Sequence, residues 1–146
     1  MKMKIKYVKL KDNAIVPFKA DKYSAGYDLS AAIDKPITIT PHTTVKIGTG
    51  LSIQPPIGYF GAVFARSGIS TKEGLRPANC VGVCDESYRG EYIVPIHNDS
   101  ENVRIIKPEQ RIAQLVFLPY IDGEFEEVKE LSNTDRGDRG FGSSGV

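Results

Sequence analysis

The chain is a succession of short runs rich in Val, Ile, Thr, Tyr and Phe, separated by clusters of Gly, Pro, Asn and Asp. Runs of this kind, bounded by turn residues, are typical of β-strands. They cover residues 4–10, 37–40, 44–54, 58–65, 91–98, 103–106, 110–120 and 124–131. No window holds a sustained 3.6-residue apolar period, and the best helix candidate is one short turn at residues 67–74. The pattern therefore predicts an all-β fold: a jelly roll, a sandwich or a barrel.

Length and charge limit the possibilities further. The 146 residues are enough for one domain with a sizeable core. The formal net charge is +1, from 19 basic and 18 acidic side chains. So balanced a charge argues against a broad electrostatic surface for nucleic acid or for an anionic membrane. Any anion that the protein binds must therefore be bound locally.

The cysteines and the N-terminus indicate a cytoplasmic protein. Cys80 and Cys84 lie close together without a His or a second Cys pair at zinc spacing, so a metal knuckle is not expected. If both lie in one strand they point to the same face, but such neighbours rarely meet disulfide geometry. We expect them to be reduced and mostly buried. The first ten residues alternate charge and apolarity, unlike a signal peptide, and no segment is long enough to span a bilayer.

The last thirteen residues, "TDRGDRGFGSSGV", differ in composition from the rest. So many glycines make ordering costly, and one phenylalanine cannot bury enough area to compensate. The segment nevertheless carries arginine forks, serine hydroxyls and glycine amides, which suit a phosphate. A frayed terminus is the alternative. "RGD" at 136–138 also invites an adhesion function, but the chain lacks secretory features.

Four further polar clusters interrupt the strand pattern. They are "SAGYDLSAA" at 24–32 with Asp28, "ARSGIS" at 65–70 with Arg66, "NCVGVCDESYRGEY" at 79–92 with Asp85 and Tyr88, and "RIAQLVF" at 111–117 with Gln114. The third has the pattern of a hairpin, two strands around "DESYRG". Each residue also has a structural explanation: a turn or cap for Asp28, a surface ion pair for Arg66, packing for Tyr88 and a backbone hydrogen bond for Gln114.

Together the motifs "AGYDLSAA", "ARSGIS", "GVCDESYRGEY", "RIAQLVF" and "RGDRGFGSSG", in this order, resemble the motifs of the trimeric dUTPases. The resemblance runs from about Ala14 to the end of the chain. It implies a distorted jelly-roll β-barrel over residues 1–131, with a flexible C-terminal tail at 132–146 that closes over the active site. It also implies a homotrimer whose sites each take the first, second and fourth motifs from one subunit, the third from another and the tail from the last.

The resemblance implies hydrolysis of dUTP to dUMP and pyrophosphate, which limits uracil in DNA and supplies dUMP for dTMP synthesis. Asp85 would activate a water for in-line attack on the α-phosphate, while Mg²⁺ orients the triphosphate and meets Asp28 through water. The substrate-binding residues would be Arg66, Ser67, Gly68 and Gln114 for the phosphates, Asn79 and Val83 for uracil, Tyr88 for deoxyribose, Phe141 stacked on the base, and Arg136, Gly142, Ser143 and Ser144 around the γ-phosphate.

Some residues depart from the family pattern, and other functions compete. Cys84 stands where a branched aliphatic residue is usual, Arg139 replaces a common glycine and Ser144 a threonine. The related dCTP deaminases would need a catalytic glutamate in place of the Asp85 and Tyr88 pattern. A nucleotide-sensing protein that uses the same pocket as a switch is a rival from another class. A purely structural jelly roll would have no use for Asp85, Arg66 and the tail together.

Overall fold

The computed structural model describes residues 3–140, and its secondary structure is almost entirely β. The elements, in chain order, are β1 (Lys6–Lys9), β2 (Tyr27–Ser30), β3 (Ile37–Ile39), β4 (Thr44–Gln54), β5 (Tyr59–Phe64), α1 (Ser67–Glu73), β6 (Leu75–Pro77), β7 (Gly82–Cys84), β8 (Glu91–Asn98), β9 (Arg104–Ile106) and β10 (Arg111–Pro119). The all-β prediction and the short helix are confirmed. Phe141, Gly142, Ser143 and Ser144, predicted to bind substrate, lie outside the described residues.

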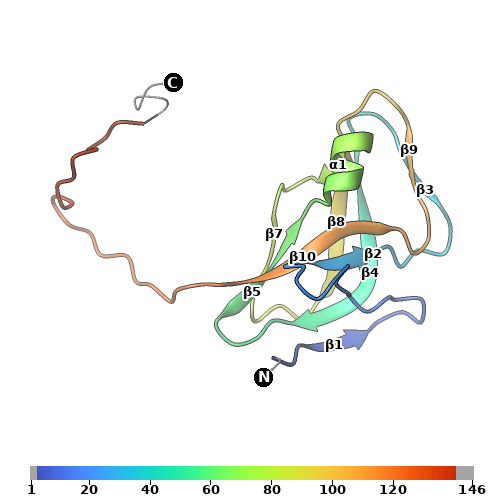
Figure 1. The fold of residues 1–146 in the computed structure, drawn as a ribbon, viewed down its shortest axis with the longest axis horizontal. Coiled ribbons are helices and arrows are strands. Elements are labelled where there is room, and N and C mark those ends of the chain that lie inside the picture. Colours follow the sequence, from blue (N-terminus) through green and yellow to red (C-terminus); the bar gives the residue numbers. More distant parts are fainter. Residues whose placement is uncertain (1–2, 141–146) are drawn as a thin grey trace.

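The strands form two four-stranded sheets and one two-stranded sheet. The first sheet has the order β1-β4-β8-β6, the second β2-β10-β5-β7, and β3 pairs with β9. All pairings given by the register are antiparallel. Figure 1 shows the two larger sheets beside each other, with α1 at one end.

The core lies between these sheets and is built from aliphatic side chains that alternate with polar ones. In β8 the pattern puts Tyr92, Val94 and Ile96 inside, each at most 2% exposed. β4 and β10 contribute in the same way, as their alternating runs predict. The largest fully buried side chains are Tyr92, Leu29, Ile39, Ile47, Leu51, Ile53, Leu75, Ile96, Ile106, Ile112, Leu115 and Val94.

α1 is short because its ends are specified locally. It follows directly from β5, with Arg66 in an extended conformation before its first turn. Gly74 ends it with a φ of 70°, in the left-handed region that glycine adopts at low cost, and its amide donates to the carbonyls of Ile69 and Ser70. The helix therefore holds residues 66–68 at the end of β5.

Two expectations about the strands are wrong. β7 and β8 do not form a hairpin: β7 pairs with β5, whereas β8 pairs with β4 and β6. Residues 85–90 consequently cross from one sheet to the other. Residues 124–131 form no strand but run exposed, away from the body of the molecule, after β10 ends at Pro119 (Figure 1).

The cysteines also differ from expectation. Cys80 is exposed in a turn with a φ of 61°, and only Cys84 lies in a strand, partly buried. Both are free thiols, as predicted. Within the part of the chain that the structure describes, no helix is long and apolar enough to cross a membrane.

Candidate active site

One group of predicted site residues lies on a single face of the second sheet. Gln114 in β10 pairs with Asp28 of β2 on one side and with Phe64 of β5 on the other. Residues paired across neighbouring strands point to the same face, so the three side chains form a row. The row lines a cavity of about 540 Å³, together with Arg66, Ser67 and Gly68. We call this the β5–α1 cavity.

Asp28 is held between two arginines at the edge of the β5–α1 cavity. The Arg66 Nε donates to its Oδ1 at 2.7 Å, and the Arg111 Nη1 donates to its Oδ2 at 3.0 Å. The Asp28 side chain is 12% exposed. A carboxylate so far removed from water needs such partners. Arg66 is thus an ion-pair partner and also lines the cavity.

Gln114 takes its position from contacts with two other segments. Its Nε2 donates to the Ala65 carbonyl at 2.8 Å. This is the backbone hydrogen bond that the structural explanation of Gln114 predicted. A β-carbon on Gly26 would lie 2.5 Å from the Gln114 Oε1, so any larger residue there would displace the end of this side chain. The amide keeps a second N–H for another partner. Gly26 did not emerge from the sequence, although it stands in the same motif as Asp28.

The β5–α1 cavity fits a metal ion only through water. Among residues 3–140, no group of three or more His, Cys, Asp or Glu side chains could hold a metal. An ionised carboxylate has about four lone-pair sites, and the two arginines engage one oxygen each. Asp28 can therefore still accept a hydrogen bond from a metal-bound water, which suits Mg²⁺ held chiefly by phosphates.

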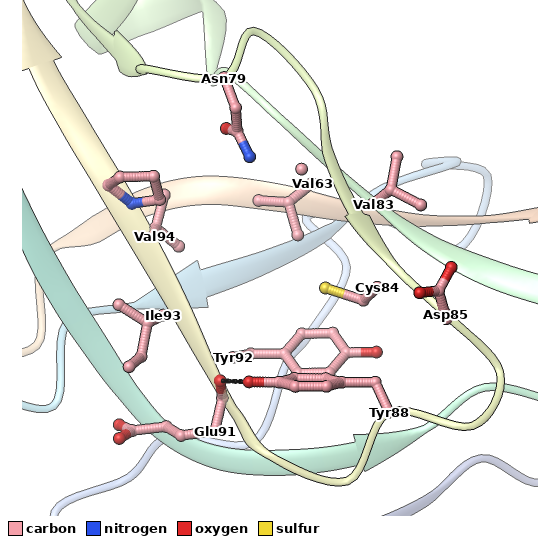
Figure 2. Close-up of a pocket in the computed structure, with 12 residues that line it drawn as sticks. Val63, Asn79, Val83, Cys84, Asp85, Tyr88, Glu91, Tyr92, Ile93 and Val94 are labelled. Carbon is pink, nitrogen blue, oxygen red and sulfur yellow. Dashed lines mark hydrogen bonds between the residues drawn. The ribbon is translucent and has the colours of Figure 1, made fainter.

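Four further predicted residues line a second cavity, between β7 and β8. Asn79, Val83, Asp85 and Tyr88 meet around a volume of about 200 Å³, which we call the β7–β8 cavity. Figure 2 shows Asn79 at one end, Asp85 near the other and the ring of Tyr88 along one side. None of the ion pairs formed among residues 3–140 involves Asp85. Its carboxylate is thus not neutralised by a cation of the described chain.

The ring of Tyr88 is fixed against its own loop. Its hydroxyl donates to the Glu91 carbonyl at 2.9 Å, and its amide donates to the Asp85 carbonyl at 3.0 Å. The ring folds back over Gly90: a β-carbon there would lie 2.5 Å from the Tyr88 Cζ. Gly90 is therefore a site residue that sequence reasoning missed. The glycine two positions after Tyr88, in "YRGEY", was the sequence feature that could have indicated it.

Tyr92 and Cys84 form the buried wall behind Tyr88 (Figure 2). The Tyr92 ring lies 6.1 Å from that of Tyr88, tilted by 39°. Burial raises the pKa of the Tyr92 hydroxyl and of the Cys84 thiol, so both stay protonated at neutral pH. The Tyr92 hydroxyl is buried without a hydrogen-bond partner among the described residues. Cys84 lines the cavity with it.

Glu86 ties the loop that carries Asp85 to two neighbouring segments. Its Oε2 accepts hydrogen bonds from the Gly58 amide at 2.8 Å and from the Tyr120 hydroxyl at 2.7 Å. These two donors lower the pKa of the Glu86 carboxyl. The hydrogen bond between Glu86 and Tyr120 also raises the pKa of the Tyr120 hydroxyl. Glu86 therefore fixes both the loop and the point where the chain leaves β10.

The two cavities share no lining residue. Asp85 lines the β7–β8 cavity, whereas Arg66 lines the β5–α1 cavity. A single chain consequently does not bring Asp85 and Arg66 into one cavity. Arg136 lines neither cavity: its Nε donates to the Arg139 carbonyl at 2.9 Å, in the exposed segment after β10.

Comparisons with known proteins identify the family of the chain. A family model described as dUTPase matches residues 12–145. The deoxyuridine 5'-triphosphate nucleotidohydrolase of Desulfitobacterium hafniense is 47% identical over 147 residues, which covers 100% of this chain and 97% of that protein. The protein of the same name from Hydrogenobaculum sp. is 41% identical over 144 residues, with 99% of each chain covered.

Solved structures extend the likeness to the whole fold. A mutant dUTPase of Staphylococcus bacteriophage 80alpha, solved with dUpNHpp, matches with a TM-score of 0.90 at 29% identity, covering 99% of this chain and 100% of that chain. The expected jelly-roll fold is thereby confirmed. By the match of the family model and by identity over its full length, this chain belongs to the dUTPase family.

Proposed function

We propose that the protein is a dUTP diphosphatase that hydrolyses dUTP to dUMP and pyrophosphate. The observation that carries the proposal is the β7–β8 cavity of this dUTPase family member, where an amide, an aromatic ring and a carboxylate without an ion-pair partner among residues 3–140 meet. The product dUMP would serve dTMP synthesis, and removal of dUTP would limit uracil in DNA.

Asp85 is the proposed general base. It would take a proton from a water placed in line with the α-phosphorus as the water oxygen bonds to phosphorus. The bond from that phosphorus to the bridging oxygen breaks, and pyrophosphate leaves with the bonding electrons. A carboxylate is a weak base at its ordinary pKa, so placement of the water supplies much of the effect.

The phosphates would lie in the β5–α1 cavity. Arg66 offers terminal guanidinium nitrogens, Ser67 a hydroxyl, Gly68 an amide and Gln114 its second N–H. Mg²⁺ bound by the triphosphate oxygens would neutralise charge and fix the bend of the phosphate chain. Asp28 would hold a water of that ion's hydration shell.

The β7–β8 cavity would select the nucleoside. The Asn79 amide and the backbone around Val83 would meet the uracil edge, whose donor and acceptor pattern cytosine reverses. The Tyr88 ring would lie against deoxyribose and leave no room for a 2′-hydroxyl. UTP is then rejected by steric collision.

The separation of the two cavities supports a homotrimer. Because Asp85 and Arg66 line different cavities of one chain, a complete site would need a second copy of the chain. The segment after β10 also supports assembly with further copies. Its apolar side chains Ile121, Phe125 and Leu131 are between 86% and 105% exposed, and a neighbouring subunit would cover them. The tail at 132–146, with Arg136, Phe141, Gly142, Ser143 and Ser144, would close over a neighbouring subunit's site.

The proposal places the enzyme in the cytoplasm, where its two free thiols stay reduced. The test of the function is a pyrophosphate-release assay with purified protein and Mg²⁺, across dUTP, dTTP, dCTP and UTP. We expect release from dUTP alone at a substantial rate. Binding of dUTP without release would instead favour a nucleotide-sensing protein, and deamination of dCTP would favour the related deaminases.

A further inference from the structure

The two arginine–aspartate pairs of this chain differ in geometry. Arg76 binds Asp99 through two nitrogens, with Nε to Oδ2 at 2.6 Å and Nη2 to Oδ1 at 3.0 Å. Arg66 binds Asp28 through Nε alone, at 2.7 Å. The two-point contact is the usual strong form for this pair of groups.

Arg111 contacts the same carboxylate as Arg66. Its Nη1 donates to the Asp28 Oδ2 at 3.0 Å and so takes one lone-pair site of the oxygen that a two-point contact from Arg66 would use. The Arg66 Nη1 instead lies 3.5 Å from the Arg111 carbonyl, at the limit of a hydrogen bond. The Arg66 Nη2 has no hydrogen-bond partner within residues 3–140. Among residues 3–140, no second arginine contacts Asp99: His97 Nε2 lies 3.5 Å from its Oδ1, and Arg76 closes onto both of its oxygens.

We propose that Arg111 is a positioning residue that keeps the terminal nitrogens of Arg66 available to the substrate's phosphates. By holding one oxygen of Asp28, it limits Arg66 to a single anchoring contact through Nε. The Arg66 guanidinium is then oriented by Asp28, while its terminal nitrogens stay available for a phosphate. Without Arg111, Arg66 would turn onto both oxygens of Asp28, as Arg76 does on Asp99, and withdraw from the β5–α1 cavity.

Charge leads to the same conclusion. Asp28 alone would cancel the charge of Arg66 at the cavity, whereas two arginines on one carboxylate leave a net positive charge for a phosphate. Arg111 does not itself line the cavity, and its side chain is 46% exposed. It therefore acts through Asp28 and not by touching the ligand.

This inference rests on the proposed function, because it takes a nucleoside triphosphate as the ligand. The test is calorimetric binding of dUpNHpp and of dUMP, in EDTA and again with Mg²⁺, to the full-length protein. We expect Arg111→Gln to weaken dUpNHpp binding about tenfold, the scale of coupling within one charge network. Binding of dUMP, which lacks the outer phosphates, should change less than about twofold on the same scale.

A double-mutant cycle tests whether Arg111 acts through Asp28. In an Asp28→Asn background, Arg111→Gln should change dUpNHpp affinity less than about twofold, because no carboxylate remains to capture Arg66. Arg104→Gln removes the same charge from β9, away from both cavities, and is the matched control. If Arg111→Gln proves unstable, Arg111→Lys is the substitute, with the same expected selectivity for the triphosphate and a smaller loss.

Three results would overturn the inference: unchanged dUpNHpp affinity in the Arg111 variants, equal loss of dUMP and dUpNHpp affinity, or full additivity with Asp28→Asn. Failure of the unmodified protein to bind dUpNHpp would instead count against the proposed function. The two failures are therefore distinguishable.

Discussion

The ring of Tyr88 occupies the space that a β-carbon on Gly90 would need, with the Tyr88 Cζ 2.5 Å from that position. The loop can therefore bring Tyr88 to the side of the β7–β8 cavity only because residue 90 has no side chain. The hydroxyl then reaches the Glu91 carbonyl and fixes the ring.

Gly90→Ala should displace this ring. Forcing an extra carbon into a filled space costs about 1–3 kcal/mol, so we expect KM for dUTP to rise roughly tenfold or the melting temperature to fall correspondingly. Steady-state kinetics and thermal unfolding measure both. Gly123→Ala is the control, because an added β-carbon there meets its nearest neighbour, Ile121, at 3.8 Å. Unchanged kinetics and stability in Gly90→Ala would show that the loop has room to spare.

Tyr88→Ala should admit UTP more than it harms dUTP, because the proposed barrier to the ribonucleotide is steric. The ratio of kcat/KM for dUTP to that for UTP, measured by pyrophosphate release, should fall. Tyr88→Phe keeps the ring and should keep the ratio. An equal loss on both substrates in Tyr88→Ala would mean that the ring only packs the loop.

The loss of folding stability at low pH should depend on Glu86. Hydrogen bonds from Gly58 and Tyr120 lower its pKa in the folded protein. The stability that it contributes is thus present above the ordinary glutamate pKa of about 4.3 and is lost as pH falls through the lowered folded value. We expect Glu86→Gln to flatten the decline of melting temperature below about pH 5. Glu124→Gln, an exposed carboxylate after β10, should leave the decline as it is.

Strand patterns along the chain were sufficient to predict the fold class, but not strand partners. The hairpin expected at 79–92 is a crossing between sheets, because β7 and β8 each find a better partner in a strand far away in sequence. The run at 124–131 has strand composition, yet it pairs with no strand of the described chain. Pairing depends on tertiary structure, which local composition does not contain.

The same limit applies to the candidate site. Asp28, Arg66 and Gln114 were identifiable from their motifs, and the register of β2, β10 and β5 gathers them. The roles of Gly26 and Gly90 depend on contacts across the fold, so sequence alone did not single them out. The single-point contact of Arg66 is likewise visible only when Arg111 is seen on the same carboxylate.

Truncation after Leu131 should leave the β core stable, because all the strands of the described chain end by Pro119. Catalysis should nevertheless collapse, since the proposed tail supplies water exclusion and the grip of Arg136 on the γ-phosphate. Thermal unfolding and pyrophosphate release measure the two effects. In a chain without native tryptophan, Phe141→Trp should report dUpNHpp binding by a change of emission. Full activity of the truncated protein would show that the tail is a frayed terminus without a role in catalysis.

The most direct test of the account is the turnover of Asp85→Asn. The amide keeps the size and polarity of the carboxylate but cannot take the proton of the attacking water. We predict dUpNHpp affinity close to that of the unmodified protein and a kcat for dUTP lower by roughly 10²–10⁴-fold, the usual loss on removing a general base. A variant that retains more than about a tenth of kcat, with the same affinity, would contradict the assignment of Asp85 as the base.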